Sequence, residues 1–228
     1  MTHILCLETA TEICSVALAA DGKCLASAED TTGNSHAEKI MLLIDECIKQ
    51  GGISMENIDA VCISSGPGSY TGLRIGTSTA KGICYALQIP LIAVSSLQGI
   101  ACGAALRNPE QKLFCPMIDA RRMEVYCALY DEKGNTLQEI SNEIVTENSF
   151  AETLEQSTVV FCGNGAEKCK PLFSSHPHAM FADSLSSAAH LIPAAFRAWQ
   201  NKQFEDTAYF EPFYLKAFKA GTPHVKGL

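Results

Sequence analysis

Ser64-Ser65-Gly66-Pro67-Gly68-Ser69-Tyr70-Thr71-Gly72-Leu73-Arg74-Ile75-Gly76 is the most informative segment of the chain. It begins at the end of the apolar run 58–64 and leads into a segment with helical spacing that reaches about Leu87. The pattern predicts a buried strand, a tight glycine turn and the start of a helix. Gly66 and Gly68 allow backbone angles, or a close approach of other backbone, that a Cβ would prevent.

Two interpretations of this glycine turn stay open at the level of sequence. Backbone N–H groups at the start of a helix form a ready anion site, so the turn is a candidate for phosphate binding. The alternative is a turn that packs tightly for structural reasons. The segment is neither a Walker A loop, since no Gly-Lys-Ser/Thr follows, nor a G-x-G-x-x-G fingerprint.

The helix after the turn has a ridge with almost no side-chain thickness, because Gly72, Gly76 and Ala80 lie four residues apart. Each glycine inside a helix costs about 1 kcal/mol relative to alanine. Close approach of another backbone is the usual reason to keep such residues. The ridge therefore packs either inside its own lobe or against another subunit.

The N-terminal sequence predicts a three-stranded antiparallel meander. The apolar runs 3–7, 13–19 and 23–29 are joined by short polar segments, and Asp21-Gly22 is a hairpin turn signal. Ser35 and the glutamate three residues later resemble a capping box, which predicts the start of a helix that ends at Gly51-Gly52.

The rest of the sequence shows a similar succession of strands and helices, with weaker signals. Further strands are predicted at 91–95, 112–118, 123–130, 136–142 and 158–162, with helices at about 96–106 and 184–203. The order suggests two α/β lobes related by duplication. We expect an N-terminal lobe at 1–108, a smaller C-terminal lobe at 109–218 and a flexible tail at 219–228.

Composition excludes several classes of protein. Of 228 residues 47% are hydrophobic, and the net charge is −8, from 17 basic and 25 acidic residues. Because the basic residues are scattered, a polyanion would need positive charge from another subunit. The sequence shows neither a membrane span nor a secretory signal. Most of the eleven cysteines lie in apolar runs without a CxxC pair, which favours reduced core thiols in a cytoplasmic protein.

A series of motifs in a fixed order carries a family resemblance. They are Cys6-Leu7-Glu8-Thr9-Ala10, Ser15-Val16-Ala17-Leu18, Ser35-His36, Gly66 to Gly76, Ala80-Lys81-Gly82, Pro90, Val94-Ser95-Ser96-Leu97, Asp119-Ala120-Arg121-Arg122 and Phe213-Tyr214-Leu215-Lys216. With these motifs the chain resembles the TsaB (YeaZ) family, the dimerisation subunits of bacterial tRNA threonylcarbamoyladenosine transferases.

The resemblance implies an actin-like (ASKHA, ribonuclease H-like) α/β fold with two lobes, the second abbreviated. It implies a non-catalytic subunit that binds TsaD, the catalytic paralogue, and works with the ATPase TsaE. Such a subunit is expected to contact tRNA only as part of the complex. Alone, such a chain forms homodimers. No intrinsic cofactor or metal is implied; ATP is used by the complex, and a nucleotide at the subunit boundary fits the resemblance.

The resemblance also suggests which residues carry these roles. The two turns that face a phosphate in such a fold are represented by Glu8, Thr9, Gly66, Gly68 and Ser69. The partner is expected on the helices at 35–50 and 72–87, because the first is amphipathic and the second is unusually flat. The residues expected in that interface are His36, Ile40, Leu43, Cys47, Gly72, Gly76, Thr79, Ala80 and Ile83.

Catalysis finds little support in the residues. TsaD has a His-x-x-x-His pair where this chain has Ser96 and Ile100, and neither residue is a good ligand for a transition metal. His176 and His178 flank a proline without a partner in sequence, and Ser69 lacks a neighbouring histidine. The competing hypotheses are a small metallopeptidase-like enzyme, an ATP-dependent phosphotransferase and a self-contained tRNA-binding protein.

Overall fold

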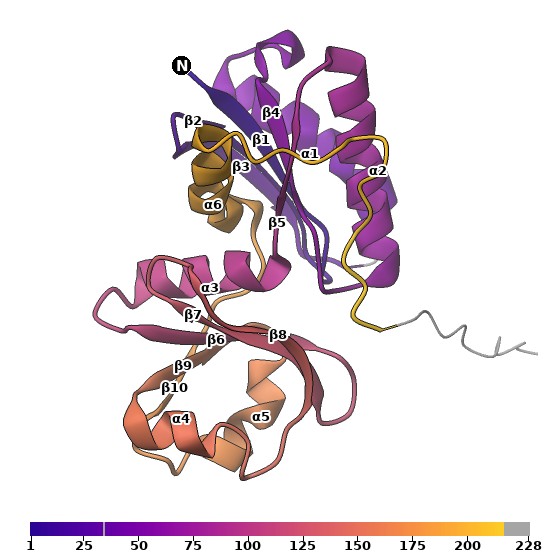
Figure 1. Cartoon of the computed structure of the whole chain (residues 1–228). Coiled ribbons are helices and arrows are strands. Elements are labelled where there is room, and N and C mark those ends of the chain that lie inside the picture. Colours follow the sequence, from indigo (N-terminus) through magenta and orange to yellow (C-terminus); the bar gives the residue numbers. More distant parts are fainter. Residues whose placement is uncertain (34, 217–228) are drawn as a thin grey trace, which may run out of the picture.

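The chain forms two stacked lobes, each built on one mixed sheet (Figure 1). The structure, a computed structural model, describes residues 1–33 and 35–216. The first sheet has five strands in the order β3-β2-β1-β4-β5, and the second has five in the order β10-β9-β6-β7-β8. Helix α3 lies between the two sheets (Figure 1). The expected two-lobe α/β fold is confirmed.

The strands and helices have the following bounds. The strands are β1 (His3–Glu8), β2 (Cys14–Ala20), β3 (Lys23–Asp30), β4 (Ala60–Ser64), β5 (Leu91–Val94), β6 (Leu113–Asp119), β7 (Glu124–Asp131), β8 (Thr136–Ile144), β9 (Val159–Cys162) and β10 (Ala179–Ala182). The helices are α1 (His36–Gly51), the 3₁₀ turn η1 (Met55–Asn57), α2 (Tyr70–Leu87), α3 (Ser96–Arg107), α4 (Ala151–Gln156), α5 (Ala166–Phe173) and α6 (Ala188–Gln200).

The first sheet has the predicted meander at one side. Strands β1, β2 and β3 pair antiparallel, and β4 and β5 extend the sheet parallel to β1. The turn between β2 and β3 has positive φ at both Asp21 (47°) and Gly22 (77°), which matches the right-handed twist of the two strands. Local sequence was sufficient to predict this part of the fold.

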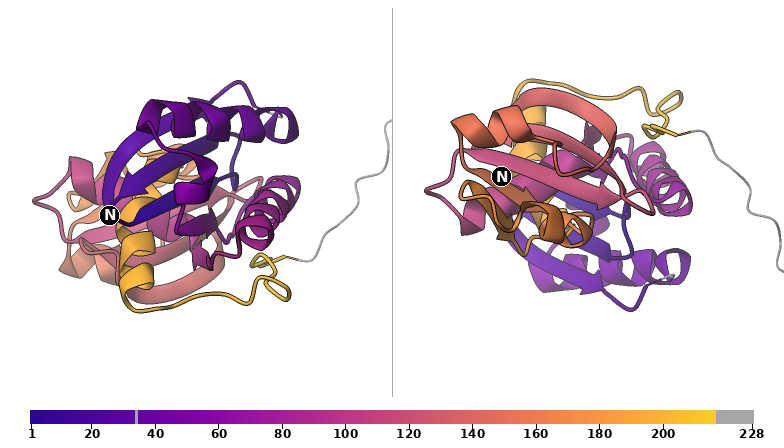
Figure 2. Two further views of the ribbon diagram at one scale, coloured as in Figure 1. Left: turned by 90° about the horizontal axis from the view of Figure 1, so that it is seen from above. Right: turned by 90° about the horizontal axis from the view of Figure 1, so that it is seen from below.

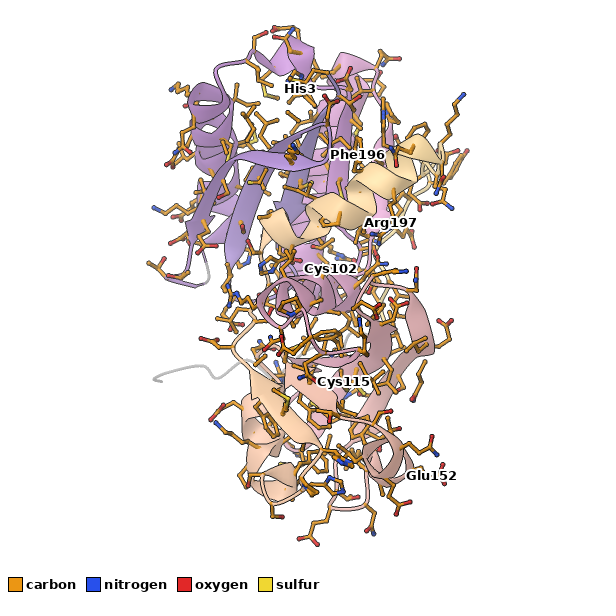
Figure 3. The ribbon with its side chains drawn as sticks, turned by 90° about the vertical axis from the view of Figure 1, so that its left-hand side faces the viewer. His3, Cys102, Cys115, Glu152, Phe196 and Arg197 are labelled. Carbon is orange, nitrogen blue, oxygen red and sulfur yellow. The ribbon has the colours of Figure 1, made fainter. Side chains whose placement is uncertain are left out.

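Helices cover both faces of the first sheet. Helices α1 and α2 bury residues such as Ile44 and Ile83 against one face. Helix α6 buries Leu191 and Ala195 against the other face, in one cluster with Cys6 of β1. Figure 3 shows Arg197 of α6 just above Cys102 of α3, where the two lobes meet.

The position of α6 corrects the expected lobe boundaries. Residues 188–216 return to the first lobe, so the second lobe does not span the expected 109–218. The reason is that the apolar face of α6 has its matching surface on the first sheet, a contact that sequence order does not reveal. The expected tail at 219–228 lies outside the described residues.

Beyond α6, residues 203–216 form an extended segment that we call the strap. It runs along the first lobe beside β5 and α2, coloured yellow in Figure 1 and visible from above and below in Figure 2. The Glu205 N–H donates to Leu91 O at 2.9 Å, and Lys81 Nζ donates to the carbonyl oxygens of Ala208 and Phe210. The strap covers part of β5, an edge strand that would otherwise be open to pairing.

The second lobe encloses a separate core. Strands β6, β7 and β8 pair antiparallel, and β9 and β10 add parallel strands. The rings of Phe150, Phe161 and Phe173 contact one another in a core with α4 and α5, while α3 packs on the other face with Phe114 and Tyr130.

The first turn of α1 differs from the prediction. Ser35 is the N-cap residue, but its side chain caps no helical N–H. Its hydroxyl donates instead to the carboxylate of Asp30, which also accepts a hydrogen bond from Thr32. The expected capping box is therefore wrong, because a nearby carboxylate competes for the same hydroxyl.

The small-residue ridge of α2 packs inside its own lobe. A methyl group added at Gly72 would lie 2.1 Å from the Thr9 carbonyl oxygen, and one added at Gly76 would lie 2.2 Å from the Thr9 hydroxyl. Ala80 is fully buried as well. Of the two explanations for these glycines, packing within the lobe is the one that the structure supports.

We predict that Gly72→Ala destabilises the chain, because the Thr9 carbonyl cannot move without displacing β1. The expected loss is about 2 kcal/mol or more in the free energy of unfolding, measured by urea denaturation. Gly82→Ala is the matched control, since nothing lies within 4 Å of its added methyl group and alanine is the better helix former. A gain of about 0.5–1 kcal/mol is expected for the control. Equal stabilities of the two variants would contradict this packing.

Candidate functional site

The glycine turn lies directly on the loop that follows β1. The Ser69 N–H donates to Ala10 O at 2.6 Å, and a methyl group on Gly68 would lie 2.3 Å from the same oxygen. The Gly66 N–H donates to the Ser96 hydroxyl at 3.1 Å. These two N–H groups, which an anion would use, are thus engaged by protein acceptors.

The strap closes the turn from the other side. The Phe213 N–H donates to Ser65 O at 2.7 Å, and the Phe213 carbonyl oxygen would be 2.6 Å from a Cβ at Gly66. Gly66 has φ of 107°, a conformation that L side chains rarely adopt. Only glycine meets both requirements at this position.

Glu8 is the buried acid of this region, with 1% of its surface exposed. Its carboxylate accepts hydrogen bonds from the Ala10 N–H at 2.6 Å and from the Ser64 hydroxyl at 2.9 Å. Burial nevertheless raises the pKa of Glu8 to about 7, because removal from water disfavours the charged form more than these donors stabilise it. Glu8 therefore changes charge near neutral pH inside the first lobe.

These contacts bear on the phosphate interpretation. Glu8 and Thr9 are buried, Gly66 and Gly68 allow close packing, and Ser69 caps α2 by accepting from the Gly72 N–H. The geometry thus gives each of the five residues a structural use. Phosphate contact at these positions stays a prediction.

A polar network joins the two lobes near the end of β6. Asn164 donates from its amide to the Glu12 carboxylate at 3.0 Å, and its side-chain oxygen accepts from the Asp119 N–H at 3.0 Å. Lys168 pairs with the Asp119 carboxylate and donates to Glu124 O. Despite partial burial, the hydrogen bond from Lys168 lowers the pKa of Asp119. The sequence analysis did not identify Asn164 or Lys168, although Gly163-Asn164-Gly165 after a buried strand was the available signal.

The turn between β6 and β7 is strained. Arg121 and Arg122 both have positive φ, 73° and 51°, where asparagine and glycine are the residues normally found. Both arginines are exposed. The Asp119 carboxylate accepts from the Arg121 N–H at 2.7 Å and holds this conformation.

The expected interface residues need correction. The structure buries nearly all of them within the first lobe, and Thr79 alone is partly exposed. The buried ones are His36, Ile40, Leu43, Cys47, Gly72, Gly76, Ala80 and Ile83. His36, for instance, contacts Thr11 O through Nε2 at 2.9 Å. The spacing identified the inward faces of α1 and α2, because apolar periodicity marks the core of a lobe before it marks a partner.

The outward faces of the same helices carry other residues. Met41 and Leu42 of α1 are 54% and 63% exposed, and Tyr85 of α2 is largely exposed too. A groove of about 750 Å³ lies beside Tyr85, between α2 and the strap, and Lys81 and Asp206 help to line it. Exposed apolar side chains of this size on adjacent helices are typical of interaction surfaces.

The positions considered for metal chemistry have structural contacts. Ser96 is fully buried and accepts a hydrogen bond from the Gly66 N–H, and Ile100 of α3 is buried in the core that α3 forms with the second sheet. His178 contacts Leu154 O through Nδ1 at 2.7 Å. Over residues 1–33 and 35–216, no group of three or more His, Cys, Asp or Glu side chains is arranged to hold a metal ion. Within those same residues, no helix is both long and apolar enough to span a membrane.

Comparisons with known proteins agree with the motifs. The model of the family described as TsaD, tRNA N6-adenosine threonylcarbamoyltransferase, matches residues 30–220. The tRNA threonylcarbamoyladenosine biosynthesis protein TsaB of Escherichia coli K12 is 31% identical over 221 residues, which cover 94% of each chain. The chain belongs to the TsaB family. The resemblance inferred from the motifs is confirmed, and it extends beyond the first lobe.

Solved structures support the same assignment. YeaZ from Pseudomonas aeruginosa is 28% identical, with a TM-score of 0.79, and the match covers 94% of this chain and 100% of that one. The activator of 2-hydroxyisocaproyl-CoA dehydratase from Clostridium difficile, solved with bound ADPNP, has a TM-score of 0.52 at 11% identity, covering 89% and 96% of the two chains. The second likeness concerns the fold alone. The chain thus has the expected actin-like fold with an abbreviated second lobe.

We predict that Glu8→Gln removes a pH dependence of stability. The folded chain holds the Glu8 proton up to about pH 7, whereas the unfolded chain releases it near the ordinary value of 4.5. The stability that Glu8 contributes is therefore present below pH 4.5 and is lost as pH rises to 7, by about 3 kcal/mol for a shift of this size.

The measurement is the urea midpoint of both proteins between pH 5 and pH 8. Glu8→Gln should gain stability over the native chain as pH rises, and the difference should level off above pH 7. A constant difference across this range would show that Glu8 does not titrate there.

We also predict that replacing Arg121-Arg122 by Asn-Gly stabilises the chain by about 1–2 kcal/mol, because this pair fits two successive left-handed residues. Thermal and urea unfolding measure the change. Lys112→Asn with Lys133→Gly removes the same two charges at the other end of the β6–β7 hairpin and should give no such gain. A loss of stability in the Asn-Gly variant would show that the arginine side chains, rather than their backbone, determine the turn.

Proposed function

We propose that the chain is a non-catalytic subunit of a tRNA threonylcarbamoyladenosine transferase, acting in the cytoplasm by supporting a TsaD-type catalytic subunit. The observation that carries the proposal is the similarity to a named TsaB protein over 94% of both chains. The match to the TsaD family model over residues 30–220 adds that the chain and the catalytic subunit share a fold.

The absence of intrinsic catalysis is part of the proposal. At the positions where TsaD has its histidine pair, this chain has Ser96 and Ile100. The Ser96 hydroxyl accepts a hydrogen bond from the Gly66 N–H, and Ile100 is buried in a hydrophobic core. The acidic net charge of −8 supports a chain that meets tRNA within the complex rather than alone. The eleven cysteines, ten of them buried, carry free thiols, which supports a reducing compartment.

The docking surface in this proposal is the outward side of α1 and α2. Met41 and Leu42 supply apolar contact area on α1. On α2 the exposed residues include Ser78, Gly82 and Ala86, whose small size lets a partner helix come close. In the absence of the catalytic subunit, the same surface on a second copy would give a homodimer.

The proposal includes two further components. A TsaE-type ATPase completes the complex, and ATP is used by that complex. A nucleotide at the boundary between subunits is part of the proposal; the N–H groups of Gly66 and Ser69 are engaged by the chain's own acceptors, so they would not be its phosphate contacts.

We predict that transfer of the threonylcarbamoyl group to tRNA requires this chain in a reconstitution with TsaD-type and TsaE-type subunits, ATP and threonylcarbamoyl-AMP. Leu42→Arg should abolish co-purification with the TsaD-type subunit, because a charge buried in an apolar contact weakens binding by about a hundredfold. Modified nucleoside is measured by mass spectrometry after digestion of the tRNA.

Leu106→Arg is the matched control, because Leu106 of α3 is 69% exposed but lies away from α1 and α2. Circular dichroism checks that both variants fold. Transfer by this chain without the TsaD-type subunit would overturn the non-catalytic assignment. Equal loss of co-purification in the two variants would remove the support for the α1–α2 surface.

A further inference from the structure

Basic and aromatic side chains gather where the strap passes the second lobe. They come from α2, from the β6–β7 turn, from β7 and from the strap. We call this set the basic–aromatic surface; it consists of Tyr70, Arg74, Arg121, Arg122, Tyr126, Tyr214 and Lys216. Nothing in the fold requires these residue types to lie together.

Ring, cation–π and ion-pair contacts connect the surface across both lobes. The Arg74 guanidinium lies 4.1 Å from the centre of the Tyr70 ring, and the Tyr70 and Tyr214 rings are 4.9 Å apart. Two residues further along the strap, Lys216 Nζ lies 5.8 Å from the centre of the Tyr126 ring. Lys216 also pairs with the Glu124 carboxylate, and this hydrogen bond lowers the pKa of Glu124.

The two arginines of the turn belong to the same surface. Glu124 closes the β6–β7 turn by donating its N–H to Arg121 O at 3.1 Å. Because the Glu124 carboxylate also pairs with Lys216, Arg121 and Lys216 contact the same residue. In the part of the chain that the structure describes, neither guanidinium forms an ion pair or a hydrogen bond. Both side chains are held outward by a backbone conformation that costs free energy.

The charge here contrasts with that of the whole chain. The net charge is −8, yet five basic residues lie in and beside this surface, counting Lys168, against the carboxylates of Glu12, Asp119 and Glu124. The sequence that follows the strap adds to this contrast. Residues 217–228 contain two lysines and no aspartate or glutamate. A local positive surface on an acidic protein is typical of a site for a polyanion.

We propose that the basic–aromatic surface binds the sugar–phosphate backbone of the RNA substrate. Arg121 and Arg122 present planar forks that match phosphate oxygens, and arginine is the residue best suited to such contacts. The half-buried tyrosine rings of this surface offer stacking positions for unpaired bases. This inference rests on the proposed function, and it assigns to this chain a direct contact with tRNA inside the complex.

The charge balance explains why this contact serves within the complex rather than alone. With eight net negative charges, the chain as a whole does not attract a polyanion, whereas arginine–phosphate contacts act locally, within the screening length of about 8 Å at physiological salt. Once the catalytic subunit holds the RNA, the two arginines add local contacts without having to capture the RNA from solution.

The test measures tRNA affinity of the complex between this chain and its TsaD-type partner by fluorescence anisotropy, from about 0.05 to 0.3 M salt. Arg121→Gln with Arg122→Gln keeps the backbone strain and removes two charges. Affinity should fall roughly tenfold near 0.1 M salt, and the slope of log K against log salt should fall by about 1.5, as expected for two lost phosphate contacts.

Two variants serve as controls. Lys112→Gln with Lys133→Gln removes the same charge at the opposite end of the β6–β7 hairpin, and affinity should stay within about twofold. Arg121→Lys with Arg122→Lys keeps the charge and should retain most of the salt slope. All variants should co-purify with the TsaD-type subunit as the native chain does.

Equal affinity and equal salt slope in the double Gln variant and its Lys112/Lys133 control would overturn the proposal. Loss of co-purification in the double Gln variant would overturn it in favour of a protein partner at this surface. Failure of the proposed function is distinguishable from both, because the native chain would then not support transfer at all. A native chain that supports transfer together with an unaffected Gln variant refutes the RNA contact alone.

Discussion

The contact between the loop after β1 and the start of α2 is the constraint on which the first lobe depends. Gly68 and Gly72 bring the backbone of the turn and of α2 against the carbonyl oxygens of Ala10 and Thr9, at distances that leave no space for a side chain. That approach holds the start of α2 against the end of β1, directly after β4. Glu8, the last residue of β1, is buried beside this loop, where its carboxyl group contacts the Ala10 N–H and the Ser64 hydroxyl and is cut off from water.

The second constraint is the return of the chain to the first lobe. Helix α6 fills the face of the sheet that α1 and α2 leave open, and the strap then crosses the edge of β5 and reaches the glycine turn through Phe213. The N-terminal lobe is thus completed by residues that follow the second lobe in sequence. The chain therefore passes from the first lobe into the second and then returns to the first. Helices α3 and α6 pack against each other where the two lobes meet (Figure 1).

Sequence reasoning succeeded where the signal was local. The Asp21-Gly22 turn, the Gly51-Gly52 helix end and the helix that begins after Ser69 follow from residues within a few positions of one another. It failed where two distant partners compete. Spacing identified a thin ridge on α2 but not its neighbour, which is Thr9, some 60 residues earlier. It read the inward faces of α1 and α2 as a partner surface, since periodicity reports burial and does not say what covers the face.

The strained Arg121-Arg122 turn shows how a local energetic defect can carry functional information. A turn that Asn-Gly would fit at lower free energy holds two charged side chains instead, and neither forms an ion pair in the described part of the chain. Stability therefore does not explain the choice of residues. Other ionised groups at the lobe junction, such as Glu12, Asp119 and Lys168, are tied into the network around Asn164. Since that network already joins the lobes, the arginines remain available for a molecule outside the chain, which is the condition that a recognition surface must meet.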